Sequence, residues 1–295
     1  MTNTSGERLD HYLVRMGHAV SRREAREIVA RGAVRLNGRR GIKGMVVRPG
    51  DSVEVEPPQA IDSIVPDADA PLDVLFEDPS LIVVNKPGAM PCHPLRPGER
   101  GTMMNAVVAR FPEAADIGDK PLEGGLIHRL DNGTSGALMI ARTPDAFAML
   151  RRAIRSGGIK RKYLALVAGN LPAAMLLTAP IAHHAKNPRR MIVCTESEAA
   201  RLHGRPAHTR IEPIRRVGNY TQVAAMPTTG VRHQIRVHLA DAGYPIVGDS
   251  LYGGAAAKFD ADRFWLHLGE IELESPASGA IKVSAPLPDD LARLI

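Results

Sequence analysis

Short apolar runs between turn residues predict a mixture of strands and helices in the longer, C-terminal part of the chain. Strands are expected where apolar residues cluster, at 74–77, 81–84, 137–141 and 162–168. One helix is expected over 102–111, and another between Thr143-Pro144 and Gly157-Gly158. Because these elements follow no regular β-α alternation, the sequence predicts an α+β fold with a largely antiparallel sheet.

The N-terminal stretch predicts a smaller fold in which a pair of helices precedes short strands. Residues 8–16 suit a short helix. Ser21 and Glu24 have the spacing of a capping box, and the helix that they open is expected to stop at Gly32. Short strands separated by Asn-Gly and Pro-Gly-Asp turns are then expected at 33–36, 46–47 and 53–55.

A segment of low periodicity separates the two parts. Residues 57–70 (PPQAIDSIVPDADA) are mostly Pro, Ala and Asp, a composition typical of a linker. The sequence therefore predicts an N-terminal domain at 1–56, a linker at 57–70 and a second domain at 71–295.

Composition narrows the class of protein. Of the 295 residues, 44% are hydrophobic and 24% are charged, which supports a sizeable core and excludes global disorder, collagen and coiled coil. No apolar run reaches the roughly 18 residues of a membrane span, and the polar start carries no secretory signal. Cys92 and Cys194, the only cysteines, are far apart, so we expect neither disulfides nor a thiolate zinc site. These features favour a cytoplasmic protein.

Positive charge is concentrated near the N-terminus. The stretch from Arg8 to Arg48 carries ten arginines, one lysine and three acidic residues, a local net charge of +8 against +6 for the whole chain. The rest of the chain is therefore slightly acidic. A solvated basic face is one interpretation, and a phosphate-binding module is the interpretation that we favour.

The turn residues, the positive charge and the order of the expected elements in this stretch resemble the S-four RNA-binding module, named for a small-subunit ribosomal protein. The matching residues are Arg8-Leu9-Asp10, Ser21-Arg22, Gly32-Ala33-Val34, Asn37-Gly38 and Gly50-Asp51. The resemblance covers about residues 7–56 and implies binding of structured RNA through the helix pair. Arg22, Arg23 and Arg26 are the candidate phosphate contacts, whereas Arg8 can instead form an ion pair with Asp10.

The most informative string in the second domain is IHRLDNGTSG, residues 127–136. Taken alone, Asp131 followed by Asn-Gly is most often turn chemistry. The string, however, resembles the H-R-L-D-x-x-T-S-G motif of the RluA branch of pseudouridine synthases. Further segments match that branch in order: Asn85-Lys86-Pro87-Gly88 with His93, Lys162 to Val167, His233 to Leu239 with Pro245 to Asp249 and Leu251 to Gly253, and Leu266-His267 with Ala285 to Pro288. The resemblance spans about residues 71–291.

The resemblance implies an isomerisation of uridine in RNA that needs no cofactor and no metal. In the family the aspartate of the motif is essential, which assigns this role to Asp131. A carboxylate can attack the sugar or assist loss of its 2′ proton, and the sequence leaves both open. The family pairs the aspartate with the arginine of H-Q-I-R, here Arg236, and such a cation favours an ionised carboxylate. Tyr163 is expected to stack on the uracil and to manage the proton at carbon 5.

Further residues are assigned to RNA or substrate by the same resemblance. Arg129 is expected to fill the space of a flipped base or to hold a phosphate, with a structural bond within its loop as an equal alternative. His128 and Leu266 are included as substrate-binding candidates, His128 more as an orienting residue of its motif. The family's T-G-R-T-H-Q-I-R reads T-G-V-R-H-Q-I-R here, so its first arginine is displaced to Arg232.

The sequence thus predicts an RNA pseudouridine synthase acting on ribosomal RNA, of the large subunit because RluC-like and RluD-like members share this layout. The expected partner is structured RNA, either ribosomal RNA or a subunit precursor, and the expected state is a monomer. The alternatives are a synthase for tRNA, a non-catalytic ribosome-assembly factor, a synthase of the small-subunit branch and a small-molecule glycosidase. A glycosidase would need a second catalytic carboxylate, and the matched motifs contain none.

Overall fold

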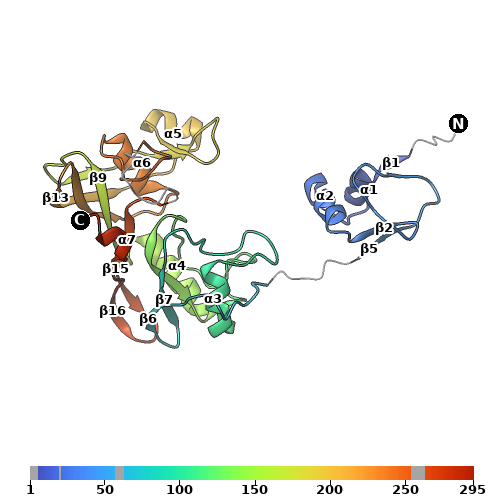
Figure 1. Ribbon diagram of the computed structural model, residues 1–295, viewed down its shortest axis with the longest axis horizontal. Helices are drawn as coiled ribbons and strands as arrows, with labels where there is room; N and C mark the ends of the chain where they lie inside the picture. Colours follow the sequence, from blue (N-terminus) through green and yellow to red (C-terminus); the bar gives the residue numbers. More distant parts are fainter. Residues whose placement is uncertain (1–5, 20, 57–62, 254–262) are drawn as a thin grey trace. The chain divides into compact units, whose positions relative to one another are not determined.

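The computed structural model describes residues 6–19, 21–56, 63–253 and 263–295. The chain forms two compact units, Met1–Ile61 and Asp62–Ile295 (Figure 1). No described helix has both the length and the apolar character that crossing a membrane requires.

Two short helices and short strands form the N-terminal unit. Helices α1 (Leu9–Arg15) and α2 (Arg22–Ala30) pack through a small apolar core that includes Leu13 and Ile28. Ser21 Oγ accepts a hydrogen bond from the Glu24 amide at 3.2 Å and so caps α2, as the sequence predicts. The strands are β1 (Glu7–Arg8) paired with β4 (Val46–Val47), and β2 (Val34–Leu36) between β3 (Arg39–Arg40) and β5 (Val53–Val55).

A nine-stranded sheet organises the second unit. Its strands lie in the order β10-β13-β14-β9-β15-β8-β7-β6, and β16 pairs with β15. All pairings among the described strands of this sheet are antiparallel except that of β15 with β8, which confirms the largely antiparallel prediction. The bounds are β6 (Val74–Glu77), β7 (Leu81–Lys86), β8 (Ser135–Ala141), β9 (Lys160–Ala168), β10 (Met175–Leu177), β13 (Thr209–Val217), β14 (Tyr220–Pro227), β15 (Leu266–Ser275) and β16 (Gly279–Ser284).

Helices cover different parts of this sheet. Figure 1 shows α3 and α4 beside the β6–β8 part, and α5 and α6 beside the part that contains β9 and β13. A hairpin of β11 (Ile181–His183) and β12 (Met191–Val193) shares a small apolar cluster with residues of α6. The helices are α3 (Met103–Arg110), a 3-10 turn (Pro112–Ala114), α4 (Pro144–Ser156), α5 (Glu196–Leu202), α6 (Gln234–Asp241) and α7 (Asp289–Ala292).

The two halves of the sheet join where β15 meets β8. His267 pairs with Ser135 and Leu268 with Gly136, the only parallel register among the described strands. Gly136 has φ +115°, and a Cβ there would lie 2.2 Å from the Leu268 carbonyl oxygen. Only glycine permits this close approach. Ser135 and Gly136 are the last two residues of the string that contains Asp131, so the motif leads directly into the centre of the sheet.

Two sequence expectations differ from the structure. Residues 57–62 of the proposed linker lie outside the described residues, but Ile64 is buried in the core of the second unit. Asn105 Nδ2 also donates to the Val65 carbonyl at 2.8 Å, so packing onto the second unit begins before Pro71. Strand β7 continues through Lys86, two residues beyond the expected end at 84, because Lys86 pairs with Gly136 of β8.

Candidate active site

The backbone around Asp131 is held on both sides. The Thr134 amide donates to the Asp131 carbonyl at 2.9 Å, which closes the turn expected for Asp-Asn-Gly. Cys92 Sγ contacts both backbone groups of Leu130, at 3.2 Å from the carbonyl and 3.3 Å from the amide. The Asp131 side chain keeps 26% of its surface exposed. The carboxylate is therefore firmly placed and still accessible.

Lys86 holds the same loop through hydrogen bonds to three backbone carbonyls. Its side chain is fully buried, and Nζ donates to the carbonyls of Pro87 (2.7 Å), Met90 (2.8 Å) and Asn132 (3.4 Å). Burial lowers the pKa of this ammonium to about 8, an effect that the charge of Asp131 partly offsets. Lys86 thus ties the Asn-Lys-Pro-Gly segment to the residue that follows Asp131.

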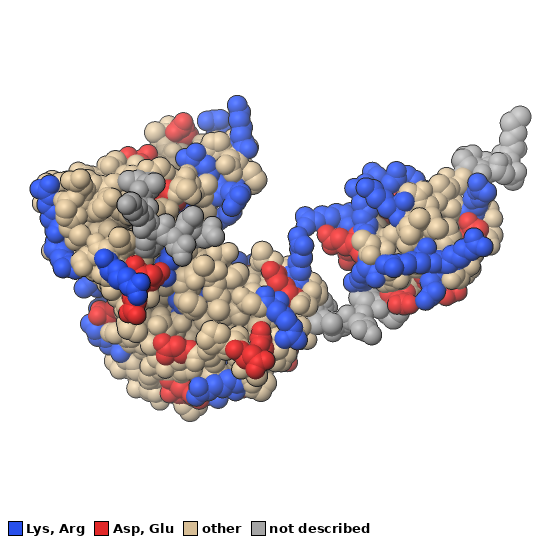
Figure 2. All heavy atoms as spheres, viewed as in Figure 1, with Lys and Arg blue, Asp and Glu red and all other residues tan. Residues whose placement is uncertain are grey.

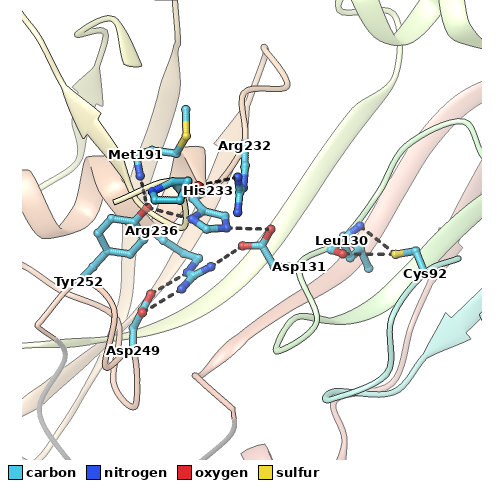
Figure 3. Close-up of polar contacts among 10 residues, drawn as sticks. Cys92, Leu130, Asp131, Met191, Arg232, His233, Arg236, Asp249 and Tyr252 are labelled. Atoms are coloured by element: carbon cyan, nitrogen blue, oxygen red, sulfur yellow. Dashed lines mark hydrogen bonds and ion pairs between the residues drawn. The ribbon is translucent and has the colours of Figure 1, made fainter. Parts of the chain in front are cut away.

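Arg236 links Asp131 to a second, buried carboxylate. Arg236 Nη1 donates to Asp131 Oδ2 at 2.7 Å, while Nε and Nη2 donate to the two oxygens of Asp249 at 2.7 and 2.9 Å (Figure 3). Burial by itself lowers the pKa of Arg236, but the hydrogen bonds and charges of both carboxylates outweigh burial and raise it. The guanidinium lies 4.1 Å from the centre of the Phe264 ring. The bidentate pair fixes the plane of the guanidinium and hence the third contact.

His233 approaches the other oxygen of Asp131. It occupies the position before α6 with φ +56°, and its Nε2 lies 3.8 Å from Asp131 Oδ1. Its Nδ1 is 2.8 Å from the Tyr252 hydroxyl oxygen, which accepts a hydrogen bond from the Met191 amide at 2.8 Å (Figure 3). Burial lowers the pKa of His233 to about 4, so the imidazole is neutral near pH 7.

Tyr163 lies in β9, opposite Ala225 of β14 and Leu268 of β15. It is 7% exposed, and burial raises the pKa of its phenol, with the charge of Asp131 as a further cause. Its hydroxyl makes no hydrogen bond to any residue that the structure describes. The phenol therefore stays protonated at neutral pH, with its hydrogen-bonding capacity free among the described residues.

His128 and Leu266 lie inside the protein. His128 is 8% exposed and its Nε2 accepts from the Met139 amide at 3.2 Å, while Nδ1 has no partner among the described residues. Leu266 is 3% exposed and pairs with Ala165 in the sheet. These positions favour support of the motif over direct contact with RNA, because neither side chain faces solvent.

His128 makes stability depend on pH. Burial, followed by the charges of Arg161 and Arg151, lowers its pKa to about 3 from an ordinary value of 6.5. Between those values the unfolded chain binds more protons, so the free energy of unfolding falls as pH drops from 6.5 toward 3, by up to about 1.4 kcal/mol per pH unit. In urea unfolding, the free energy of unfolding of His128→Gln should depend less steeply on pH between about 3 and 6.5 than that of wild type. The same substitution at the exposed His208 should leave this dependence unchanged. Equal slopes for His128→Gln and wild type would contradict this placement.

The exposed arginines assigned to RNA each lie beside a carboxylate of their own unit. Arg129 Nη1 donates to Glu123 at 3.3 Å, and 62% of the Arg129 side chain is exposed. In the N-terminal unit, Arg8, Arg22 and Arg26 surround the buried Asp10, with shortest distances of 3.0, 3.7 and 3.2 Å. The hydrogen bond from Arg8 is the largest cause that lowers the Asp10 pKa to about 2. Asp10 therefore gathers three half-exposed guanidinium groups on one face.

Sequence reasoning missed the roles of three residues around Asp131. Asp249, Tyr252 and Lys86 all stand within the motifs that carry the resemblance, but no spacing rule connects them to Asp131. Asp249 is 13 positions from its partner Arg236, and Lys86 is 46 positions from Asn132. The available signal was the presence of charged residues inside otherwise apolar segments, which calls for a buried partner.

Comparison with known proteins settles the family. Residues 80–241, more than half of the chain, match the family model described as RNA pseudouridylate synthase. The chain belongs to this family and is an RNA pseudouridine synthase. Residues 7–53 match the S4 domain. Both resemblances drawn from the motifs are thereby confirmed, as is the enzyme class, an isomerase.

Relatives of the synthase align over nearly its whole length. It is 36% identical to an uncharacterized RNA pseudouridine synthase of Chloroflexus aurantiacus, over 97% of this chain and 88% of the relative. It is 33% identical to the ribosomal large subunit pseudouridine synthase D of Xanthomonas campestris, over 99% and 89%. The solved structure of human RNA pseudouridylate synthase domain containing 1 superposes with a TM-score of 0.59 at 25% identity, over 76% of this chain and 86% of that one.

Proposed function

We propose that this synthase converts specific uridines of large-subunit ribosomal RNA, free or in a subunit precursor, to pseudouridine in the cytoplasm, with Asp131 as the catalytic carboxylate. The observation that carries the proposal is the carboxylate of Asp131, accessible at the end of a buried chain from Asp249 through Arg236. The substrate class is supported by full-length relatives of about one-third identity named as large-subunit synthases.

The reaction breaks the bond between N1 of uracil and C1′ of the sugar and joins C5 of the same base to C1′. A proton leaves C5 and N1 gains one, so no electrons are exchanged with a cofactor. Asp131 either attacks C1′ or takes the 2′ proton, and in both roles its free lone pairs must face the sugar. Arg236 holds one carboxylate oxygen by its 2.7 Å bond, which leaves the other, 3.8 Å from His233 Nε2, available to the sugar.

Tyr163 supplies the second function of the site. A protonated phenol with no hydrogen-bond partner among the described residues can stack under uracil and exchange a proton at C5. The target nucleotide must leave its stack to reach Asp131. Arg129, two residues before Asp131 and held among the described residues only by Glu123, can release that contact and occupy the space left by the base.

The S4 domain is proposed to bind phosphates of the RNA outside the target nucleotide. Figure 2 shows Lys and Arg side chains spread over the N-terminal unit, and Arg22, Arg23 and Arg26 on α2 are its candidate phosphate contacts. Arg23 pairs with Glu27, one turn along the same exposed helix face, and with no other described residue.

Deletion of residues 1–56 is expected to weaken RNA binding and to flatten its salt dependence, because phosphate contacts release counterions when they form. Isomerisation of a minimal RNA should survive in part, since the Asp131 site lies wholly in the second unit. Binding titrations between about 50 and 200 mM salt measure how the affinity of the full-length and of the shortened protein depends on salt. An unchanged slope in the shortened protein would rule out the phosphate-binding role.

The alternatives of a tRNA synthase and a non-catalytic assembly factor are separated by one experiment. The gene is deleted in its host, and pseudouridines are mapped in ribosomal RNA and tRNA by carbodiimide treatment and reverse transcription. We expect loss of sites in large-subunit RNA that wild type restores and Asp131→Asn does not. Loss confined to tRNA would overturn the substrate assignment, and an unchanged map with an assembly defect would favour the assembly factor.

A further inference from the structure

The hairpin next to the site carries positive charge that no acid offsets. From 169 to 195 the chain has three basic residues and no acidic residue. All three, Lys186, Arg189 and Arg190, lie in the loop between β11 and β12. Arg232, directly before His233, contacts this loop by donating from Nη1 to the Pro188 carbonyl at 3.2 Å. Within the described residues none of the four forms an ion pair.

The backbone of this loop is ordered by its own hydrogen bonds. His184 Nδ1 accepts from the amides of Lys186 (3.1 Å) and Asn187 (3.0 Å). The Arg190 amide in turn donates to the Asn187 carbonyl at 3.0 Å. The basic side chains are therefore presented from a fixed loop, so binding through them costs little ordering of the backbone.

Two further contacts attach the loop to the reaction centre. The Met191 amide donates to the Tyr252 hydroxyl oxygen, which also contacts His233. The guanidinium carbons of Arg190 and Arg236 lie 5.6 and 5.1 Å from the centre of the same Tyr252 ring.

The two arginines on this ring differ in their partners. Arg236 is neutralised by two carboxylates, whereas Arg190 has none and its Nε is buried without a partner in the described part of the chain. The positive charge of Arg232 also reaches His233, since it is one of the causes that lower the pKa of that imidazole. Figure 3 shows Arg232 beside His233 at the rim of the Asp131 site.

We propose that the β11–β12 loop and Arg232 bind the backbone phosphates that flank the target uridine. Resting on the proposed function, this assigns the RNA contact nearest to the reaction. Asp131 and Asp249 repel a polyanion, and cations with no acidic partner next to them offset that repulsion when RNA is bound. A phosphate beside Arg190 would supply the anion that its guanidinium lacks. The displaced arginine of the H-Q-I-R motif thereby gains a role at Arg232.

The test compares full-length variants for binding to an unmodified transcript of large-subunit ribosomal RNA at several salt concentrations. The double variant Arg190→Gln, Arg232→Gln is matched by Arg216→Gln, an exposed arginine whose side chain bonds only the Gly218 carbonyl in the described part of the chain. Arg216 lies near Tyr220, where β14 begins. Tyr220 pairs with Ala168 of β9, and Ala168 is five residues, or about 17 Å along the strand, from Tyr163. A second double variant, Arg190→Lys, Arg232→Lys, keeps both charges.

We expect the glutamine pair to raise Kd about tenfold near 0.1 M salt and to reduce the slope of log K against log salt by about 1 to 2. Arg216→Gln should change neither, and the lysine pair should restore most of the slope. Wild-type affinity and slope in the glutamine pair would overturn the proposal. An equal loss in Arg216→Gln would also overturn it. A lysine pair that binds as weakly as the glutamine pair would overturn it too, because the loop would then act as a structural support for Tyr252. If wild type binds but forms no pseudouridine, the proposed function fails and this binding result still stands.

Discussion

Asp131→Asn is expected to lower kcat at least about 10³-fold while RNA affinity stays within about twofold. Asparagine has the shape of aspartate but neither the negative charge nor the basicity that the reaction needs. The fold should survive, because Arg236 keeps its bidentate bond to Asp249 and Lys86 still holds the loop backbone. Single-turnover assays with saturating enzyme separate this chemical defect from binding.

Asp241→Asn provides the matched control for Asp131→Asn. It removes the same charge from an exposed position at the end of α6, the helix that carries Arg236. We expect its kcat to remain within about twofold of wild type, as for a surface carboxylate remote from the reacting atoms. An Asp131→Asn enzyme that turns over at the wild-type rate would show that the catalytic carboxylate lies elsewhere.

Asp249→Ala is expected to affect both stability and turnover. Asp249 has a 1% exposed side chain and neutralises a guanidinium that is itself only 7% exposed. The variant leaves the buried guanidinium with a single carboxylate, the partly exposed Asp131, and without both bonds of its bidentate partner, which costs about 3–5 kcal/mol of unfolding free energy. Turnover should fall by about 10²-fold or more, because Arg236 loses the two bonds that orient its contact with Asp131. Urea unfolding and kcat measure the two effects.

Glu212→Ala is the comparison for the loss of Asp249. Glu212 also bonds an arginine, Arg210 at 2.6 Å, but the two side chains are 40% and 64% exposed. Solvent screens this pair, so its loss should cost no more than about 1 kcal/mol. Equal and small effects for the two variants would show that burial of the Arg236 pair does not stabilise the protein.

Local patterns predicted helices α1 to α4 and strands β2 and β4 to β9, because their signals lie within a few residues. The elements from β10 onward, among them the long strands β13, β14 and β15, were not predicted. Ser21 caps α2, and α4 runs from Pro144 after its Thr143 N-cap to the left-handed Gly157, where the sequence places its limits. Strands β1 and β3 were missed, since pairs such as Glu7–Arg8 and Arg39–Arg40 carry no periodicity. Their pairing depends on a partner strand that a local window does not contain.

The site was predicted only in part for a similar reason. The family motifs pointed to Asp131, Tyr163 and Arg236, and the structure joins Asp131 to Arg236 across 105 positions. Nothing local predicts that Lys86 continues a strand and then turns its ammonium onto three carbonyls. Its burial follows from the pairing with Gly136, a tertiary contact. The role of Asp249 likewise comes from its contact with Arg236, and its own sequence neighbours do not indicate it.

The most direct test of the central claim is tritium release from large-subunit ribosomal RNA labelled at carbon 5 of uridine, incubated with the full-length wild-type protein. Loss of the C5 proton is obligatory when C5 bonds to the sugar, so release counts the uridines converted. We predict release from large-subunit RNA that reaches a plateau of a few sites per molecule, with none from tRNA. No release from any RNA that the protein binds would contradict the account.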